Sequence, residues 1–521
     1  MALLALLVAV VGPTSLSGSD AVQAARAWRE NQERAILDEF VGLLRLPNSA
    51  QDLAALRRNA QAIAGILERR GVRTRLLESS NAPPVVYGEL ATPGARQTIT
   101  FYAHYDGHPA EPERWYTRGP FSPVLMSTAL EAGGQPIPLP NPGWPSDPEW
   151  RLYARSAADD KAAIIAMAAA LEALRQRQVP LEANLKFFIE GENEIGSPHL
   201  EPLLRAHRQL LASDLWLLVD GALPANRQQQ LVFGARGWLA LELTVYGPRR
   251  ELDSAEFSNW SPNPALQLAR LLASMRDETG KVLIEGFYRG VAPLSKAELE
   301  AIAQAPNYDL ALKRELGLAE TEGGSRTLAE AINQPALNIR GIAAGTVGAA
   351  APRRIPALAR ASVEVHLVKG MDPRTTAARL AEHIRKQGFY VTDAEPGESL
   401  RRTYSRICRI EQEPALNPVR TPMELDVSQR VIAAVEKARG PVMKMPTGGP
   451  VPAMSAVAGI LEAPVILVPI ANHDGNQHSH NENLRLQNLW DGIEVLAALM
   501  ALPAPGAPAQ KSTLAAARSS P

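Results

Sequence analysis

The segment 101–109 contains the first residues in the chain whose types and spacing suit metal binding or catalysis. It reads Phe-Tyr-Ala-His-Tyr-Asp-Gly-His-Pro and continues a hydrophobic run over 97–103, which is typical of a buried strand. His104 and Asp106 are two positions apart, and such residues point the same way in an extended segment. The carboxylate of Asp106 can therefore reach the His104 ring and fix which nitrogen faces outward. This is the arrangement of a metal-binding histidine that is oriented by a carboxylate.

Further carboxylates follow other apolar segments. Asp159 and Asp160 precede an Ala-rich helix expected over 162–175. The strand expected over 184–189 leads into Glu190-Gly-Glu-Asn-Glu194, and the strand expected over 214–219 ends in Asp220. Because open α/β sheets present their ligand-binding groups at the carboxyl ends of strands, this repetition indicates a functional site more strongly than any one residue does.

The elements around these residues predict two kinds of domain. Helices and strands alternate up to residue 232, and the α/β pattern returns with a helix over 426–439 and a strand over 464–469. Between them, the strictly alternating strands 238–245 and 361–367, with helices at 264–275 and 373–386, predict an α+β insertion with its own small sheet. The stretch from 276 to 333 is expected to be irregular.

Composition limits the class of protein. The chain of 521 residues is long enough for two domains. Its net charge of -1 gives no electrostatic reason to expect a nucleic-acid partner. Cys408 is the only cysteine, so no intrachain disulfide can form.

The two ends of the chain carry their own patterns. Residues 1–12 are almost wholly apolar, and a run of small and polar residues follows to residue 19, so we expect a signal peptide over 1–19 and export to the periplasm or medium. A mis-assigned start codon is the alternative, and it would leave the protein cytoplasmic. Residues 503–521 are rich in Ala, Pro and Ser, which predicts a disordered tail.

Four blocks, taken in order, resemble the co-catalytic dinuclear zinc peptidase and aminoacylase family, whose members include bacterial glutamate carboxypeptidase, carnosinase and succinyl-diaminopimelate desuccinylase. The blocks are His-Tyr-Asp at 104–106, Ala-Asp-Asp-Lys at 158–161, Glu-Gly-x-x-Glu-x-Gly-Ser at 190–197 and His-Ser-x-Asn-Glu at 478–482. The resemblance implies an α/β catalytic domain over 20–232 and 417–502, with a mixed, mostly parallel sheet and helices on both faces. It also implies an inserted α+β lid over 233–416, through which we expect a homodimer.

The resemblance also implies a ligand set for two zinc ions per subunit, with Mn²⁺ or Co²⁺ as alternatives. His104, Asp220 and a bridging Asp159 would hold one ion, and Asp159, Glu194 and His478 the other. Imidazole nitrogen and carboxylate oxygen are suitable ligands for zinc. A water bound by both ions would attack an amide bond in a small peptide or N-acyl amino acid. Asp160 is not expected to be a ligand, and we expect ordinary surface histidines at four positions: His108, His199, His207 and His383.

The chain departs from the family pattern where the proton is handled. Asn193 stands where the family has its general-base glutamate, and a carboxamide has no titratable carboxylate. Glu192 is the adjacent candidate, although neighbouring side chains at a strand end point apart.

Substrate-binding positions depart as well. Asp253 occupies the position of the family's lid histidine, and His366 that of an arginine. The turn containing Gly448 and Gly449 has Pro450 in place of serine. Strong selectivity for a substrate carboxylate is therefore not expected, because that selectivity needs a bidentate arginine.

Three hypotheses follow for the function. The first is an active two-metal amidohydrolase or exopeptidase. The second is a homologue that retains its metals but is catalytically impaired, and that acts as a binding or scaffold protein. The third is an α/β protein whose carboxylates are grouped by chance, which predicts no bound metal.

Overall fold

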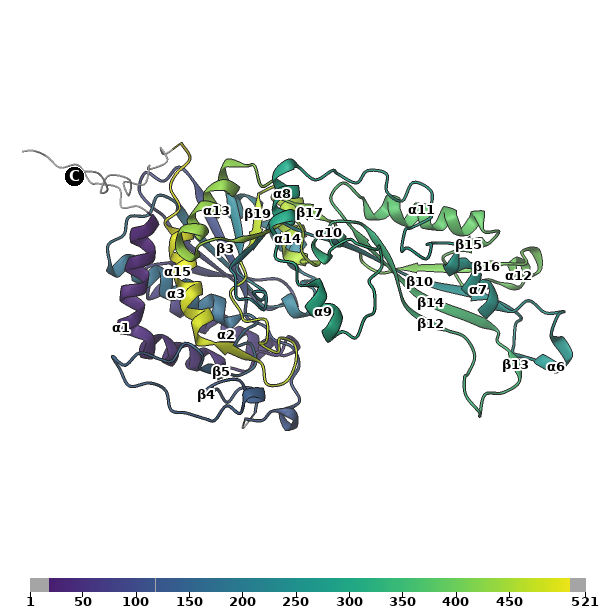
Figure 1. Cartoon of the computed structure of the whole chain (residues 1–521), viewed down its shortest axis with the longest axis horizontal. Helices are drawn as coiled ribbons and strands as arrows, with labels where there is room; N and C mark the ends of the chain where they lie inside the picture. The colour runs from purple at the N-terminus through teal and green to yellow at the C-terminus, as the bar shows by residue number, and fades with distance from the viewer. Residues whose placement is uncertain (1–17, 118, 507–521) are drawn as a thin grey trace, which may run out of the picture. The chain divides into compact units, whose positions relative to one another are not determined.

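The computed structural model describes residues 18–117 and 119–506 (Figure 1). Residues 1–17 of the predicted signal peptide and 507–521 of the predicted tail lie outside this part of the chain. The described residues form two compact units. The first unit comprises residues up to 231, 424–442 and 466 onward, and the second comprises 232–423 and 443–465. The second unit is thus inserted into the first.

The first unit is built on a mixed sheet. The strands of this sheet lie in the order β1-β2-β6-β3-β7-β19-β8-β18, and the residues of the last strand, β18, are counted with the second unit. β3 pairs in parallel with β6 and β7, whereas β2 pairs antiparallel with β1 and β6. The strands are β1 (Arg73–Leu77), β2 (Val85–Leu90), β3 (Thr98–His104), β6 (Asn184–Glu190), β7 (Leu215–Leu218), β19 (Val465–Leu467), β8 (Gln230–Val232) and β18 (Met443–Met445). Parallel β6, β3 and β7 end together, so the residues that follow them meet at one edge.

Helices pack around this sheet, and α1, α3 and α15 lie side by side (Figure 1). α3 also packs on β3, and α2 packs on β1 and β2. α3 is buried along almost its whole length, which explains its run of alanines: small side chains allow close approach to neighbouring helices. The helices are α1 (Gly18–Leu44), α2 (Leu53–Glu68), α3 (Lys161–Gln176), α4 (Leu200–Ala206), α5 (Arg208–Leu211), α13 (Asp426–Arg439) and α15 (Leu486–Met500).

A small antiparallel sheet supports the loops of the first unit. It consists of β4 (Val124–Met126), β5 (Arg151–Tyr153) and β20 (Asn483–Arg485), in the order β20-β5-β4. Three 3₁₀ turns accompany these loops, at Pro112–Arg114, Leu130–Ala132 and Asn193–Ile195. The last of these turns follows β6 and carries a candidate ligand.

The second unit contains a five-stranded sheet of order β12-β14-β10-β16-β15. β10 (Gly237–Tyr246) pairs antiparallel with β14 (Leu358–Leu367) and β16 (Ile407–Gln412). β12 (Ala336–Ala343) and β15 (Tyr390–Thr392) form the edges. Leu239, Leu241, Leu243 and Val245 of β10 are buried, as the alternation predicted, but Ala240 and Thr244 between them are buried as well, so the strand is covered on more than one face.

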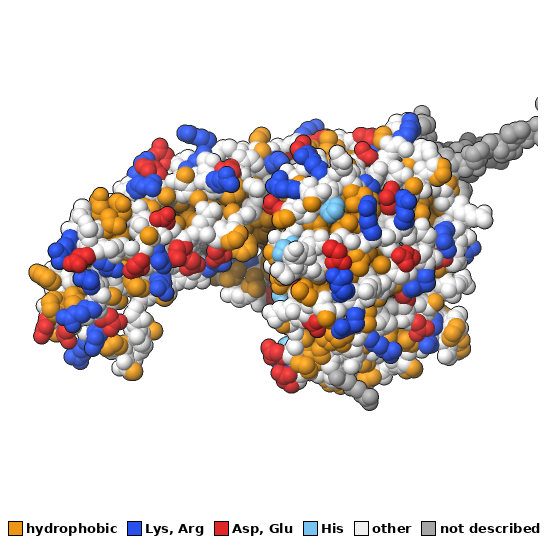
Figure 2. All heavy atoms as spheres, turned by 180° about the vertical axis from the view of Figure 1, so that it is seen from behind, with side chains coloured by type: hydrophobic (Ala, Val, Ile, Leu, Met, Phe, Trp, Pro, Cys, Tyr) orange, Lys and Arg blue, Asp and Glu red, His pale blue; other side chains and the backbone are white. Residues whose placement is uncertain are grey.

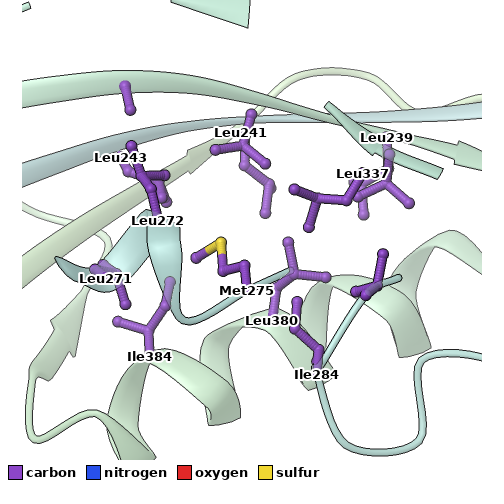
Figure 3. Packing of buried hydrophobic residues seen from close by; sticks show 14 of the residues in the cluster. Leu239, Leu241, Leu243, Leu271, Leu272, Met275, Ile284, Leu337, Leu380 and Ile384 are labelled. Carbon is purple, nitrogen blue, oxygen red and sulfur yellow. The ribbon is translucent and has the colours of Figure 1, made fainter. Parts of the chain in front are cut away.

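The buried face of this sheet packs on two helices, α7 (Pro264–Ala273) and α11 (Pro373–Lys386). Figure 3 shows Leu241 and Leu243 of the sheet facing Leu272, Met275 and Leu380. The second unit therefore has a hydrophobic core of its own.

The remaining elements of the second unit are short. The strands are β9 (Gly234–Ala235), β11 (Leu252–Asp253), β13 (Arg354–Ile355) and β17 (Val419–Arg420). The helices are α6 (Ser254–Phe257), α8 (Lys296–Gln304), α9 (Asp309–Glu315), α10 (Leu328–Ala331), α12 (Glu398–Thr403) and α14 (Pro452–Ile460).

The expectation of an irregular stretch up to residue 333 was wrong, because α8, α9 and α10 lie within it. Ser295 and Thr327 each form a capping box with a glutamate three residues later. These caps start helices too short to show a hydrophobic period.

Positive and negative side chains are interspersed over the face of the molecule seen in Figure 2, in keeping with the net charge of -1. Among the described residues, none of the helices is both long and apolar enough to span a membrane.

Candidate metal centre

His104 is the last residue of β3, and Asp106 lies two residues beyond it. Nδ1 of His104 is 3.2 Å from Oδ1 of Asp106, and both side chains are buried. Asp106 also accepts hydrogen bonds from the backbone N–H groups of Asn193 (3.2 Å) and Glu194 (2.9 Å). One carboxylate therefore orients the histidine and anchors the turn after β6.

Asp159 lies between two groups of candidate ligands. Its Oδ1 is 2.9 Å from Nε2 of His104, and its Oδ2 is 2.8 Å from Nε2 of His478. His104, Asp159 and Asp220 have ligand atoms within 4.8 Å of one another. A second group with the same spacing contains Glu194 and His478. The two oxygens of Asp159 thus face different groups, as a bridging carboxylate must.

The segment that carries Asp159 is held by the buried carboxylate of Glu482. Oε1 accepts hydrogen bonds from the N–H groups of Ala158 and Asp159, both 2.9 Å. Oε2 accepts from the N–H of Ser156 (2.8 Å) and from Nη1 of Arg155 (2.9 Å). The carboxylate thus holds three backbone N–H groups in place. The glutamate of the terminal His-Ser-x-Asn-Glu block therefore has a structural role, separate from that of the histidine.

The loop before His478 is fixed by a second set of charges. Asp474 accepts hydrogen bonds from Nη2 of Arg151 (2.6 Å), Nδ2 of Asn472 (2.9 Å) and Nη2 of Arg485 (3.2 Å). Burial opposes ionisation of Asp474, but the hydrogen bonds outweigh it and lower its pKa. Arg151 and Arg485 come from the small sheet, so that sheet positions the loop.

The carboxylates of the candidate site lie close together, and this proximity opposes their ionisation. Burial and the charge of Asp159 raise the pKa of Glu194 to about 8 and that of Asp220 to about 6. Burial lowers the pKa of His104, but its hydrogen bonds to Asp106 and Asp159 leave that pKa well above its usual value. Divalent cations would neutralise this cluster, and imidazole and carboxylate donors suit Zn²⁺, with Mn²⁺ and Co²⁺ as alternatives. The donor set therefore fits a two-metal centre.

Asp160 lies beside the centre with a different task. Its buried carboxylate accepts a hydrogen bond of 3.2 Å from the backbone N–H of His104. Burial raises its pKa well above the usual range, and the charge of Asp220 adds to this. Asp160 thus supports the backbone of a candidate ligand.

Two of the four histidines expected to be ordinary surface residues, His108 and His383, are not, and a third, His199, is partly exposed but paired. Nε2 of His108 is 3.0 Å from Oε2 of Glu194, and His108 belongs to the group that contains Glu194 and His478. His199 binds Glu192, and His383 is buried with Nε2 2.9 Å from the hydroxyl of Ser274. The sequence offered no signal for His108, because one histidine in a Gly-His-Pro loop has no period and no matching motif.

Glu192 and Asn193, the two residues at the position of the family's general base, are both engaged in hydrogen bonds. Glu192 is buried, and its oxygens contact the backbone N–H (2.8 Å) and Nδ1 (2.9 Å) of His199. Nδ2 of Asn193 donates to the hydroxyl of Tyr102 (2.8 Å), which donates to Oε2 of Glu190 (2.8 Å). Burial raises the pKa of Glu190 to about 7. No pattern in the sequence indicates this hydrogen-bonded chain of Asn193, Tyr102 and Glu190.

The predicted substrate-binding residues all belong to the second unit. Asp253 is exposed and caps α6 by accepting from the N–H of Ala255 (2.8 Å). Nε2 of His366 is 3.1 Å from Oε1 of Glu364. Gly448 pairs with Gly234 through its N–H (2.8 Å), and Gly449 is exposed. Their role toward substrate stays a prediction.

An α/β domain that gathers two adjoining imidazole and carboxylate groups at its strand ends has the architecture of a metallohydrolase. Comparison with known families gives the same class and makes it specific. Residues 100–502 match the profile of peptidase family M20/M25/M40, and the chain belongs to this family. Membership supports metal-dependent peptide hydrolysis as its chemistry.

Individual relatives are distant but cover most of the chain. The Cys-Gly metallodipeptidase dug1 of Schizosaccharomyces pombe is 25% identical over 436 residues, which are 82% of this chain and 85% of that protein. The human Beta-Ala-His dipeptidase is 25% identical over 435 residues, 81% of this chain and 78% of that protein.

Solved structures show the same fold. The M20 family metallo-carboxypeptidase Sso-CP2 from Sulfolobus solfataricus has a TM-score of 0.70 at 26% identity, with 90% of this chain and 98% of that chain covered. Human carnosine dipeptidase 1 has a TM-score of 0.64 at 21% identity, with 92% and 99% covered. These likenesses confirm the predicted fold class, an α/β domain with an inserted domain.

Proposed function

We propose that the protein is a two-metal exopeptidase that cleaves the amide bond of a dipeptide or another small peptide, with N-acyl amino acids as the alternative substrates. The observation that carries the proposal is the position of Asp159, whose two oxygens each lie within 3 Å of a different imidazole. The relatives named as dipeptidases support the choice of dipeptides. We further infer that zinc is the resident metal and that each subunit holds two ions.

The residues of the chain have separate tasks in this proposal. His104, Asp159 and Asp220 would hold one ion, and Glu194, His478 and the second oxygen of Asp159 the other. When bound, such ions lower the pKa of a shared water and polarise the carbonyl of the substrate. Asp106 and Glu482 act on the ligands, because they fix the ring of His104 and the backbone of Asp159.

A second candidate function rests on the proton-handling residues. The carboxamide of Asn193 donates a hydrogen bond to the hydroxyl of Tyr102 and has no group that could act as a general base. The carboxylate of Glu192 is hydrogen-bonded to His199. General-base catalysis contributes about 10²- to 10⁴-fold, so a chain without it would bind metal and peptide but turn over slowly. Such a protein would act by binding.

One experiment separates the two functions. The purified protein is loaded with zinc and assayed against dipeptides, including Cys-Gly and β-Ala-His, and against N-acyl amino acids. We expect hydrolysis of at least one dipeptide that stops when a chelator removes the metal. If no member of the panel is cleaved while the protein still binds two zinc ions, the binding function is supported and the exopeptidase proposal fails.

We also infer a homodimer that forms through the second unit. The edge strand β12 supports this, because residues 340–343 at its end are exposed and include Ile342, 61% exposed. An unpaired and partly apolar strand edge is a template for pairing with another chain. Light scattering should give twice the monomer mass, and an Ile342→Lys variant should shift it toward the monomer.

A further inference from the structure

His108 lies inside the candidate metal centre, although it matches none of the blocks that define the site. Its Nε2 is 3.0 Å from Oε2 of Glu194. Its ring centroid is 4.4 Å from that of His478, at an angle of 47°. His108, Glu194 and His478 each offer a ligand atom within 4.8 Å of the others. Two imidazoles and one carboxylate therefore converge on the same point.

The backbone holds His108 in this place. The preceding Gly107 donates its N–H to the carbonyl of Asn48 (2.8 Å) and accepts from the N–H of Ala50 (3.2 Å). A Cβ atom at Gly107 would lie 2.5 Å from Oγ of Ser156, so only glycine allows this close approach. His108 thus projects from a chain segment that is fixed on its N-terminal side.

We propose that His108 is a direct ligand of the ion held by Glu194 and His478. The inference rests on the proposed function, because it assumes that this group binds metal. It adds a donor that the sequence comparison with the family did not supply.

The additional donor makes the two centres unequal. The group around His104 offers three donors, from His104, Asp159 and Asp220. The group around Glu194 offers four, from Asp159, Glu194, His478 and His108. Four protein donors are typical of closed zinc sites, and three are typical of catalytic sites that keep one position open. The position left for substrate therefore lies on the side of His104 and Asp220.

The donor set also affects the choice of metal. Imidazole favours zinc, whereas carboxylate and water suit Mn²⁺. A centre with two imidazoles should prefer Zn²⁺ over Mn²⁺ more strongly than the group around His104 does. Removal of His108 should weaken zinc binding more than manganese binding.

Calorimetric titration of the metal-free full chain with zinc tests the proposal. We compare the natural protein with His108→Ala, and with His108→Gln as a variant that keeps most of the side-chain volume. His480→Ala is the matched control, because it removes a half-buried histidine of the neighbouring loop whose ring lies 3.4 Å from Oγ of Ser479. Unfolding of each variant in chelator checks that the metal-free fold is intact.

The natural protein should bind two zinc ions. Loss of a residue that only orients a ligand lowers metal affinity about 10- to 100-fold. Loss of a direct ligand should cost at least as much, so both His108 variants should bind zinc at least that much more weakly at one site. Zinc affinity at the other site should be unchanged. His480→Ala should bind both ions as the natural protein does. The visible spectrum of the cobalt-loaded protein should also change at one site only in the His108 variants.

The titration distinguishes failure of the proposed function from failure of the proposal for His108. If the natural protein binds no zinc, the proposed function fails. If the natural protein binds two ions and His108→Ala binds them with unchanged affinity and an unchanged cobalt spectrum, the proposed function stands and His108 is not a ligand. A raised KM in that variant would then place His108 against the substrate.

Discussion

The carboxamide of Asn193 donates a hydrogen bond of 2.8 Å to the phenol oxygen of Tyr102. The backbone of the same residue donates to Asp106, which orients His104. Asn193 therefore occupies a fixed position beside the candidate metal ligands, and its side chain serves as a hydrogen-bond donor. A glutamate in this position would bring a proton acceptor to the turn that carries Glu194.

Replacement of Asn193 by glutamate tests whether the chain lacks a general base. If it does, Asn193→Glu should raise kcat by about 10²-fold or more, the usual range for general-base catalysis. Steady-state kinetics of the zinc-loaded protein measure this. Asn193→Gln is the control, because it has the length of glutamate without the carboxylate. An unchanged or lower kcat for Asn193→Glu would mean that another group, Glu192 first, accepts the proton.

Asp106 should control metal affinity without being a ligand. Asp106→Asn keeps the size of the side chain but weakens the contacts to Nδ1 of His104 and to the N–H groups of Asn193 and Glu194. We expect zinc affinity to fall about 10- to 100-fold, as is usual for carboxylates that orient a histidine ligand. Competition with a coloured chelator measures the affinity. Equal affinity for the variant and the natural protein would contradict this role.

Glu482 should stabilise the fold even without metal. Glu482→Gln replaces one acceptor oxygen with an N–H₂ group, which faces either the backbone donors or Arg155. We expect the free energy of unfolding to fall by about 3–5 kcal/mol, the usual cost of breaking a buried ion pair, because a buried charge is left without a partner. Urea unfolding of the metal-free protein gives the free energy of unfolding.

Glu78 provides the comparison for Glu482. Its ion pair with Arg57 is about half exposed on both sides, so Glu78→Gln should cost clearly less than Glu482→Gln. Equal losses for the two variants would show that Glu482 has no special part in the fold.

Asp474 should give the fold a measurable dependence on pH. Its pKa in the folded state is lowered, so its contribution to stability is present above the ordinary aspartate pKa of about 3.9 and is lost as pH falls below it. Asp474→Asn should therefore destabilise the protein by about 1 kcal/mol at pH 7, a value reduced by solvent screening because the side chain is 38% exposed. The difference between variant and natural protein should shrink between pH 5 and pH 3 in urea unfolding. A difference that stays constant or grows would contradict the assignment.

The sequence predicted long and periodic elements well. The helix Asp426–Arg439 has the predicted bounds, and the alternation of Leu239 to Val245 identified β10. The short helices α8 to α10 were not predicted, because they are too short to show a hydrophobic period and only α8 and α10 begin with a capping box. Local patterns thus predict elements that carry a continuous buried face.

The site was predictable only where a motif marked it. His104, Asp159, Glu194, Asp220 and His478 stand in family blocks or at strand ends, and the structure brings them together. The contacts of His108 with Glu194, of Asn193 with Tyr102 and of Glu192 with His199 depend on how the turn 193–195 and the loop 107–109 meet. Neither the periodicity nor the spacing of residues in the sequence predicts such tertiary contacts between loops.

The central claim is that Asp159 bridges two metal ions. Anomalous diffraction at the zinc absorption edge, from crystals grown with zinc, tests it most directly. If Asp159 is the bridge, two peaks should lie about 3.5–4 Å apart, each about 2.0–2.2 Å from a different oxygen of Asp159. One peak lies beside His104 and Asp220, and the other beside Glu194 and His478. A single peak, or two peaks that share no carboxylate, would show that Asp159 is not a bridge between two ions.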